Sequence, residues 1–178
     1  MIVLGLGISR KETKKIHNFL NNQEKFIFDY ESDIEKISWY DSENIVVNRI
    51  EQLENRLYKN TKSENSFTTT GDVGFYFLPY IELLLNNFPY LKIISTKKSK
   101  KKTFVDVMSD IETKNSLLSR LFMFKKKYKN HWINHNGSNW EKDFQLDKCY
   151  PKFNVKNLDS SINSYIEMYI FELKKIQK

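Results

Sequence analysis

The chain begins with MIVLGL, a run that has no polar residue and no helical spacing of its apolar side chains. Such a continuous apolar run is typical of a strand buried on both faces, as in a parallel sheet. After Gly7 the pattern changes, because Ile16, Phe19 and Leu20 recur at helical spacing. A buried strand, a glycine loop and a helix therefore follow one another within about twenty residues, and this order predicts an α/β fold.

Strand and helix patterns alternate along the rest of the chain. Further strands are predicted at KFIFDY, at FTTTGDV up to Gly71, and at LKIIST, with MIVLGL and LKIIST as neighbouring interior strands. Helices are predicted in SDIEKISWY, in GFYFLPYIELLLNNF, over 44–58 and 104–127, and over the last twenty residues, where Asp159 or Ser160 is expected as the N-cap. The sequence thus predicts one domain, residues 1–178, with a mainly parallel central sheet flanked by helices.

Composition limits the compartment and the chemistry. The single Cys149 has no partner for an internal disulfide, and no Cys/His spacing resembles a zinc site. The longest apolar stretches are far shorter than the roughly 20 residues of a membrane span. We therefore expect a soluble cytoplasmic protein without a metal centre and without a membrane partner.

The net charge of +7 comes mostly from lysine, which is concentrated in KKSKKK (97–102) and KKKYK (125–129). One interpretation is an ordinary solvated surface. The other is a polyanionic partner, either a cofactor with several phosphates or a nucleic acid. Nucleic acid is the less favoured partner, because no recognised nucleic-acid motif accompanies the lysines.

The loop from Gly7 to Lys14 is the default place for a phosphate in such a fold. It connects the first strand to a helix, where several backbone N–H groups and the helix dipole favour an anion. The generic phosphate motifs are absent, because position 10 is not a third glycine and no Gly-Lys-Ser/Thr ending exists. By spacing alone, a phosphate site and an ordinary tight turn both remain open.

The same loop carries a family resemblance. GLGISRKETKK resembles the 5'-phosphosulfate loop of sulfotransferases, whose variants read Gly-Leu-x-x-x-Arg-Thr-Gly-Thr-x-Ser. Arg10 and Thr13 match this pattern, whereas Glu12 stands where the family has Gly and Lys15 stands where it has Ser.

Two later blocks extend the resemblance over most of the chain. DVGFYFLPYIELLLNNFPYLKIISTKKSKKKTFVDVM is similar to the family stretch that supplies the 3'-phosphate site, with Lys98 in the place of an Arg and Asp106 in the place of a Ser. The third block resembles the C-terminal part of small bacterial, phage and marine sulfotransferase-like proteins. It consists of NHW, WEKDFQLDKCYPKF and the Tyr-rich last helix.

The resemblance implies a P-loop NTPase-like sulfotransferase fold and 3'-phosphoadenosine 5'-phosphosulfate (PAPS) as cofactor. It also implies transfer of a sulfuryl group to a hydroxyl or amine of a small-molecule or glycan acceptor. The residues expected to contact the cofactor are Gly7, Ser9, Arg10, Lys11, Thr13, Lys14, Lys98 and Asp106.

Sulfuryl transfer needs a cation near the bridging oxygen, a role that the resemblance gives to Arg10, and a base for the acceptor proton. His131, His135 and Asp72 are candidate bases by residue type. Each has a simpler alternative, since a histidine in an aromatic loop is commonly a surface residue and Asp72 after Gly71 suits a turn or a cap. The nearby aromatic residues are expected to form a packed lid rather than a substrate platform: Trp132, Trp140, Tyr150 and Phe153.

The departures from the family pattern leave two functions open. A carboxylate at Glu12 would compete with a bound phosphate, or else it stabilises the helix start and pairs with Lys15. Lys98 lacks the bidentate fork of arginine, and Asp106 replaces a hydroxyl donor with an anion. The chain is therefore expected to be a PAPS-dependent sulfotransferase, or a non-catalytic homologue that has lost the cofactor and binds another anion or a partner.

Overall fold

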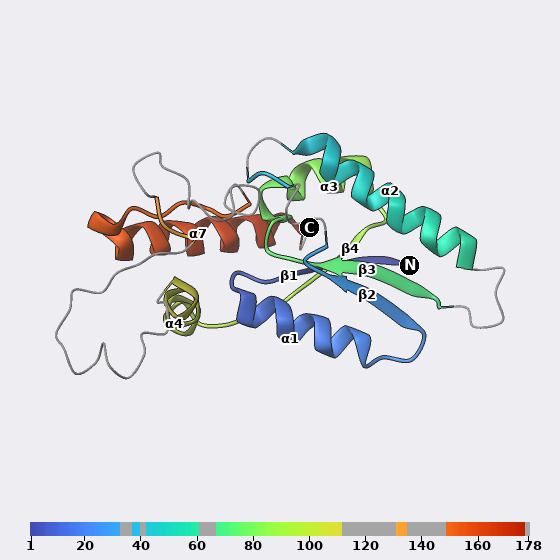
Figure 1. The fold of residues 1–178 in the computed structure, drawn as a ribbon, viewed down its shortest axis with the longest axis horizontal. Helices are drawn as coiled ribbons and strands as arrows, with labels where there is room; N and C mark the ends of the chain where they lie inside the picture. Colours follow the sequence, from blue (N-terminus) through green and yellow to red (C-terminus); the bar gives the residue numbers. More distant parts are fainter. Residues whose placement is uncertain (33–36, 40–41, 61–66, 112–130, 135–148, 177–178) are drawn as a thin grey trace.

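The computed structural model describes residues 1–32, 37–39, 42–60, 67–111, 131–134 and 149–176. Within these ranges one sheet contains four parallel strands in the order β2-β3-β1-β4 (Figure 1). The strands are β1 (Ile2–Leu6), β2 (Phe26–Tyr30), β3 (Thr69–Val73) and β4 (Lys92–Ser95). The predicted α/β class with a parallel sheet is confirmed, and each strand ends at the same edge.

Strand β1 lies in the interior of the sheet, and all five of its residues are buried. Leu4 and Leu6 pack into the larger core cluster, whereas Val3 packs on the opposite face into a smaller one. A Cβ atom added at Gly5 would lie only 2.8 Å from Ile16 Cγ2, so glycine lets a helix approach this strand closely. The MIVLGL prediction is confirmed, because a strand covered on both faces needs apolar side chains throughout.

Helix α1 (Arg10–Asn21) covers the face of the sheet that carries the smaller cluster. Ile16 and Leu20, four residues apart, pack against Val3, Phe28 and Val73. Phe19, which the sequence pattern also placed on the buried side, is 62% exposed. The buried stripe of α1 is therefore narrower than predicted.

Helices α2 (Glu43–Asn60) and α3 (Ile81–Asn87) cover the opposite face, and the short helix η2 (Leu78–Tyr80) leads into α3. α2 inserts Val46, Ile50 and Leu53 into the larger cluster. The predicted helix GFYFLPYIELLLNNF is only partly helical, since residues 74–77 form a turn before Pro79.

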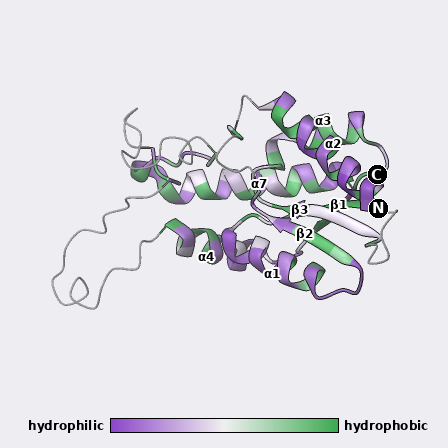
Figure 2. Cartoon of the chain, turned by 45° about the vertical axis from the view of Figure 1, so that its right-hand side comes forward, coloured by the Kyte–Doolittle hydropathy of each residue, from purple (hydrophilic) through white to green (hydrophobic). Residues whose placement is uncertain are grey.

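Helices α4 (Lys100–Ile111) and α7 (Leu158–Ile176) pack against each other beyond the carboxyl ends of the strands (Figure 1). Hydrophobic residues recur along α7, whereas α1 is coloured mainly hydrophilic (Figure 2). In the described ranges no helix is both long and apolar enough to cross a membrane.

Several element boundaries differ from the sequence predictions. Strand β3 continues past Gly71 to Val73, and β4 is an edge strand of the described sheet rather than an interior one. A run of β-branched residues indicates a strand, but it does not show whether that strand pairs with a neighbour on one side or on both sides of the sheet. The predicted helix over 104–127 is α4 as far as Ile111, and residues 112–130 lie outside the described residues.

Two predicted helix features are also corrected. Asp159 lies in the first turn of α7 rather than at its N-cap, because the helix η3 (Val155–Asn157) runs directly into α7. Asn154 caps η3 instead, with its side chain accepting the N–H of Lys156. In SDIEKISWY, residues 37–39 are not helical, and the segments 33–36 and 40–41 lie outside the described residues.

Candidate functional site

A tight turn from Gly7 to Ser9 joins β1 to α1 at the carboxyl edge of the sheet. Ser9 is the N-cap of α1: its Oγ accepts the N–H of Glu12 at 3.3 Å, and its carbonyl accepts the N–H of Thr13 at 3.0 Å. A Cβ atom added at Gly7 would lie 2.7 Å from the Thr13 nitrogen, so only glycine allows this close approach. The turn places the backbone N–H groups of the loop and of the helix start near one another.

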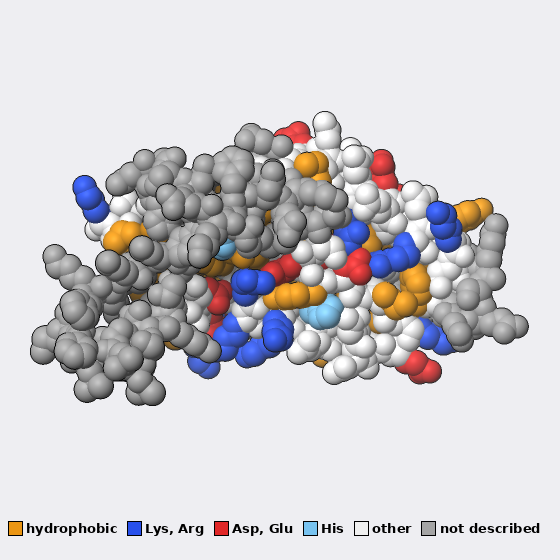
Figure 3. All heavy atoms as spheres, in the orientation of Figure 1, with side chains coloured by type: hydrophobic (Ala, Val, Ile, Leu, Met, Phe, Trp, Pro, Cys, Tyr) orange, Lys and Arg blue, Asp and Glu red, His pale blue; other side chains and the backbone are white. Residues whose placement is uncertain are grey.

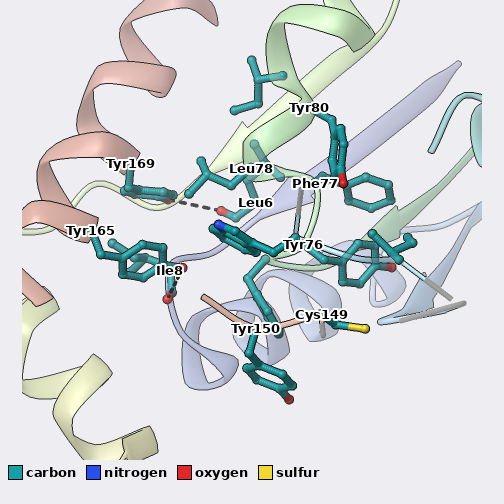
Figure 4. Close-up of a cluster of buried hydrophobic side chains, with 14 of the residues drawn as sticks. Leu6, Ile8, Tyr76, Phe77, Leu78, Tyr80, Cys149, Tyr150, Tyr165 and Tyr169 are labelled. Atoms are coloured by element: carbon teal, nitrogen blue, oxygen red, sulfur yellow. Dashed lines mark hydrogen bonds between the residues drawn. The ribbon is translucent and has the colours of Figure 1, made fainter. Parts of the chain in front are cut away.

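Two tyrosines of α7 donate hydrogen bonds to backbone carbonyl groups, one at the end of β1 and one in this turn (Figure 4). The Tyr169 hydroxyl donates to the Leu6 carbonyl at 3.3 Å, and the Tyr165 hydroxyl donates to the Ile8 carbonyl at 3.1 Å. The sequence analysis did not identify these residues, although their spacing of four in a helix places both on one face. The last helix therefore fixes the loop in position.

The carboxylate of Glu12 occupies the inside of this turn. The residue is only 1% exposed. Its Oε2 accepts the N–H of Ile8 at 3.2 Å, and its Oε1 lies 2.7 Å from Lys98 Nζ. The prediction that Glu12 pairs with Lys15 is wrong, because the buried carboxylate points into the turn rather than along the helix surface. The loop donor and the nearby lysine thus already bind an anionic group of this chain.

Lys98 and Asp106, the predicted 3'-phosphate residues, contact each other. Lys98 Nζ lies 2.6 Å from Asp106 Oδ2, and Lys11 Nζ lies 3.0 Å from Asp106 Oδ1. Burial favours a higher pKa for Asp106, but the hydrogen bonds from Lys98 and Lys11 hold that pKa below its ordinary value. Asp106 therefore links the predicted 3'-phosphate residue Lys98 to Lys11 of the predicted 5'-phosphosulfate loop through two ion pairs.

Arg10 also contacts carboxylates of this chain, one through its side chain and one through its backbone. Its Nη2 lies 2.9 Å from Glu31 Oε2, and its backbone N–H donates to Asp110 Oδ2 at 2.8 Å. Glu31 also accepts the hydroxyl of Thr13 at 3.3 Å, and it adopts a left-handed backbone with a φ of 49°. Burial raises the pKa of Asp110 to about 6. The sequence analysis missed Glu31, whose position directly after strand β2 could have indicated it.

Basic side chains gather around the first turns of α1 (Figure 3). Arg10, Lys11, Lys14 and His17 line a shallow groove there, beside Tyr30 and Asp110. Lys14 is exposed and has no ion pair with any described residue, in contrast to Arg10 and Lys11. In the described part of the chain no group of three or more His, Cys, Asp or Glu side chains could hold a metal ion.

The candidate base His131 lies in the aromatic layer. Its ring stacks on Tyr150, with centroids 5.3 Å apart. Burial raises the pKa of Tyr150 well above its ordinary value, and the charge of Arg10 opposes that rise. His131 therefore stacks on a tyrosine that interacts electrostatically with Arg10, whereas the candidate base His135 and the predicted lid residue Trp140 lie outside the described residues.

The predicted aromatic lid is formed by its described members. Trp132, Tyr150 and Phe153 are buried and pack with Phe75 and Tyr165. This packing joins the segment 149–153 to α7 and to the turn after β3.

Asp72, the third candidate base, lies inside strand β3 and is not exposed. Its Oδ2 accepts hydrogen bonds from Arg49 Nε and from the Tyr76 hydroxyl, both at 3.0 Å. Its Oδ1 is buried and makes no hydrogen bond with the described residues. The expectation of a turn or cap is wrong, and burial in the sheet separates this carboxylate from any acceptor in solvent.

We expect Asp72 to make the stability of the protein depend on pH. Burial raises its pKa from 3.8 to about 6, even though Arg49 lowers it. Between these two values the folded protein keeps a proton that the unfolded chain releases, so this contribution is complete below about pH 4 and is lost as the pH rises through about 6. Chemical denaturation should show the unfolding free energy of wild type falling by about 2 kcal/mol relative to Asp72→Asn from pH 4 to 7. Parallel curves for the two proteins would contradict this expectation.

We expect Ser9→Ala to lower the unfolding free energy by about 1 kcal/mol, because the N–H of Glu12 loses its capping oxygen. Ser9→Asp should retain the cap but place a second carboxylate beside Glu12, so its stability should fall further at pH 7 than at pH 4. Equal stability of Ser9→Ala and wild type in urea denaturation would count against the capping role.

These observations define an α/β protein whose candidate ligand site lies at the carboxyl edge of a parallel sheet, where such folds bind ligands. Comparisons with models of protein families, with curated proteins and with solved structures found no match for this chain.

Proposed function

We propose that this chain is a non-catalytic sulfotransferase-like protein whose 5'-phosphosulfate site is occupied by its own Glu12. One observation carries the proposal: the Glu12 carboxylate accepts the loop N–H of Ile8 while it pairs with Lys98. A sulfotransferase loop would offer this N–H and this cation to the cofactor. Here both groups serve the stability of the protein.

Electrostatics argue against simultaneous binding of the cofactor. Two unit charges 4 Å apart repel by about 1 kcal/mol in water and by about 4 kcal/mol near a protein surface. Glu31 neutralises Arg10. Glu12 and Asp106 both pair with Lys98 and neutralise its charge. The site therefore offers little net positive charge to a phosphosulfate group.

A PAPS-dependent sulfotransferase is the second candidate function. Arg10 and Thr13, the two residues that match the family loop, lie in the first turn of α1, and Lys98 meets the same turn from the end of β4. In this case the cofactor would have to displace Glu12 from the loop, with Arg10 stabilising the leaving phosphate and His131 as a candidate proton acceptor.

Calorimetric titration of the wild-type protein with adenosine 3',5'-bisphosphate separates the two candidates. The proposal expects no measurable binding at about 1 mM ligand, and no release of labelled sulfate from PAPS over the rate in buffer. Micromolar binding by wild type would contradict the proposal and support the sulfotransferase. The Glu12→Gln variant completes the test, because it removes the charge of Glu12 but keeps its size.

A further inference from the structure

A cavity of about 310 Å³ lies between α7, α4 and the segment that follows β4. One wall is apolar and comes from a single face of α7, where the spacing of three and four residues brings its members together: Ile166, Tyr169, Ile170 and Leu173. Its volume is at the lower end of the range for small-molecule sites, which are mostly apolar with a few polar groups.

The other walls of the cavity are polar and basic. Thr96, Lys97 and Lys98 come from the segment after β4, and Lys174 comes from α7. Lys98 is already paired with Glu12 and Asp106, but Lys97 and Lys174 are exposed and form no ion pair with any described residue. The Thr96 hydroxyl is buried in the same wall and interacts with the Tyr169 hydroxyl.

We propose that this cavity binds a small amphipathic anion, that is, a molecule with an apolar body and one terminal carboxylate or sulfate. The apolar body lies against the face of α7, and the acidic group meets Lys97 and Lys174 and accepts the Thr96 hydroxyl. Glu12 is the only carboxylate among the described lining residues and is already paired with Lys98, whereas Lys97 and Lys174 form no ion pair with a described residue, so the cavity favours an anion over a cation. This binding goes beyond the proposed function, because it uses Lys97, Lys174 and the apolar face of α7 rather than the Glu12 carboxylate and the N–H groups of the loop.

Calorimetry with four simple probes tests the proposal. Octanoate and octyl sulfate should bind with dissociation constants below about 1 mM, and their relative affinity indicates which acidic group is preferred. Octylammonium has the same apolar body with the opposite charge, and acetate has the charge without the body. Both should bind at least about tenfold more weakly than octanoate.

Paired variants locate the site. Lys97→Gln with Lys174→Gln should weaken octanoate binding about tenfold, because two attractive charges are lost. The matched control, Lys92→Gln with Lys101→Gln, removes two exposed lysines that do not line the cavity, so it should bind as wild type does. Leu173→Trp should abolish binding by filling the cavity, with wild-type circular dichroism showing that the fold is kept.

Three results would overturn the proposal: no binding of octanoate or octyl sulfate up to about 10 mM, equal affinity for octylammonium, or an equal loss in the control pair. None of them depends on whether adenosine 3',5'-bisphosphate binds, so this proposal and the proposed function fail separately.

Discussion

Glu12→Gly is expected to bind adenosine 3',5'-bisphosphate at least about tenfold more tightly than wild type and to melt at a lower temperature. Removing the carboxylate frees the N–H of Ile8 and one side of Lys98, and it removes a repulsion worth about 1–4 kcal/mol at separations near 4 Å. Glycine at this position is also the residue that the sulfotransferase loop carries. Calorimetry on both proteins at low salt measures the gain in affinity.

The loss of stability in Glu12→Gly has separate causes. A hydrogen bond to a charged group contributes about 1.5–3 kcal/mol, and glycine costs a helix about 1 kcal/mol relative to alanine. We therefore expect the unfolding free energy to fall by about 2–4 kcal/mol, which corresponds to a melting temperature lower by roughly 5–15 °C for a chain of this size.

Two controls separate charge, bulk and helix propensity. Glu12→Gln keeps the size of the side chain, so any gain in affinity that it shows comes from the lost charge. Glu51→Gly places glycine at an exposed position of α2 and reports the cost of helix propensity alone. If Glu12→Gly loses stability but binds no more tightly than wild type, the buried carboxylate is a structural anion and the loop is not a former phosphate site.

The sequence predicted those parts of the site that depend on neighbouring residues. The strand MIVLGL, the glycine turn and the helix that begins near Arg10 form one local unit, and its apolar pattern determines it. Glu12 was also identified as the residue that decides the character of the loop. Its partner was predicted wrongly, because Lys98 lies 86 positions further along the chain. A local sequence pattern cannot predict which charged residue from a distant part of the chain pairs with a buried carboxylate.

The remaining misses have the same physical origin. Glu31, Asp110 and the two tyrosines of α7 reach the turn only because β2, α4 and α7 pack around the start of α1. Asp72 was taken as a candidate base because of its residue type, whereas its burial in β3 depends on helix α2 covering the sheet. Residue type indicates which chemistry is available, but the packed structure decides whether solvent or a substrate reaches it.

The largest effect on stability is expected from Arg49→Met. The guanidinium of Arg49 is the cation that meets the buried Asp72, and it also pairs with Asp29. Removing one partner of a buried ion pair leaves an uncompensated charge and costs about 3–5 kcal/mol. At pH 7 the melting temperature should therefore fall by roughly 10–20 °C, as measured by differential scanning calorimetry.

Lowering the pH should reduce the stability that Arg49→Met loses relative to wild type. Burial raises the pKa of Asp72, and Arg49 opposes that rise, so the pKa is higher still without Arg49. The folded variant then holds the proton on Asp72 at pH 5, where the unfolded chain releases it, and a neutral carboxyl needs no counter-ion. The deficit of Arg49→Met relative to wild type should therefore be smaller at pH 5 than at pH 7.

The double variant Arg49→Met with Asp72→Asn distinguishes a lost charge partner from lost packing. An asparagine at position 72 still accepts the Tyr76 hydroxyl but carries no charge, so the double variant should recover more than half of the stability that Arg49→Met loses. Arg56→Met is the matched control, because Arg56 is partly exposed and its partner Asp29 keeps the contact with Arg49; we expect it to cost about 1 kcal/mol or less. A double variant as unstable as Arg49→Met alone would mean that the apolar stem of Arg49, rather than its charge, supports α2 on the sheet. In that case Asp72 would also lose its dependence on Arg49, and the pH 5 and pH 7 deficits of the single variant would be equal.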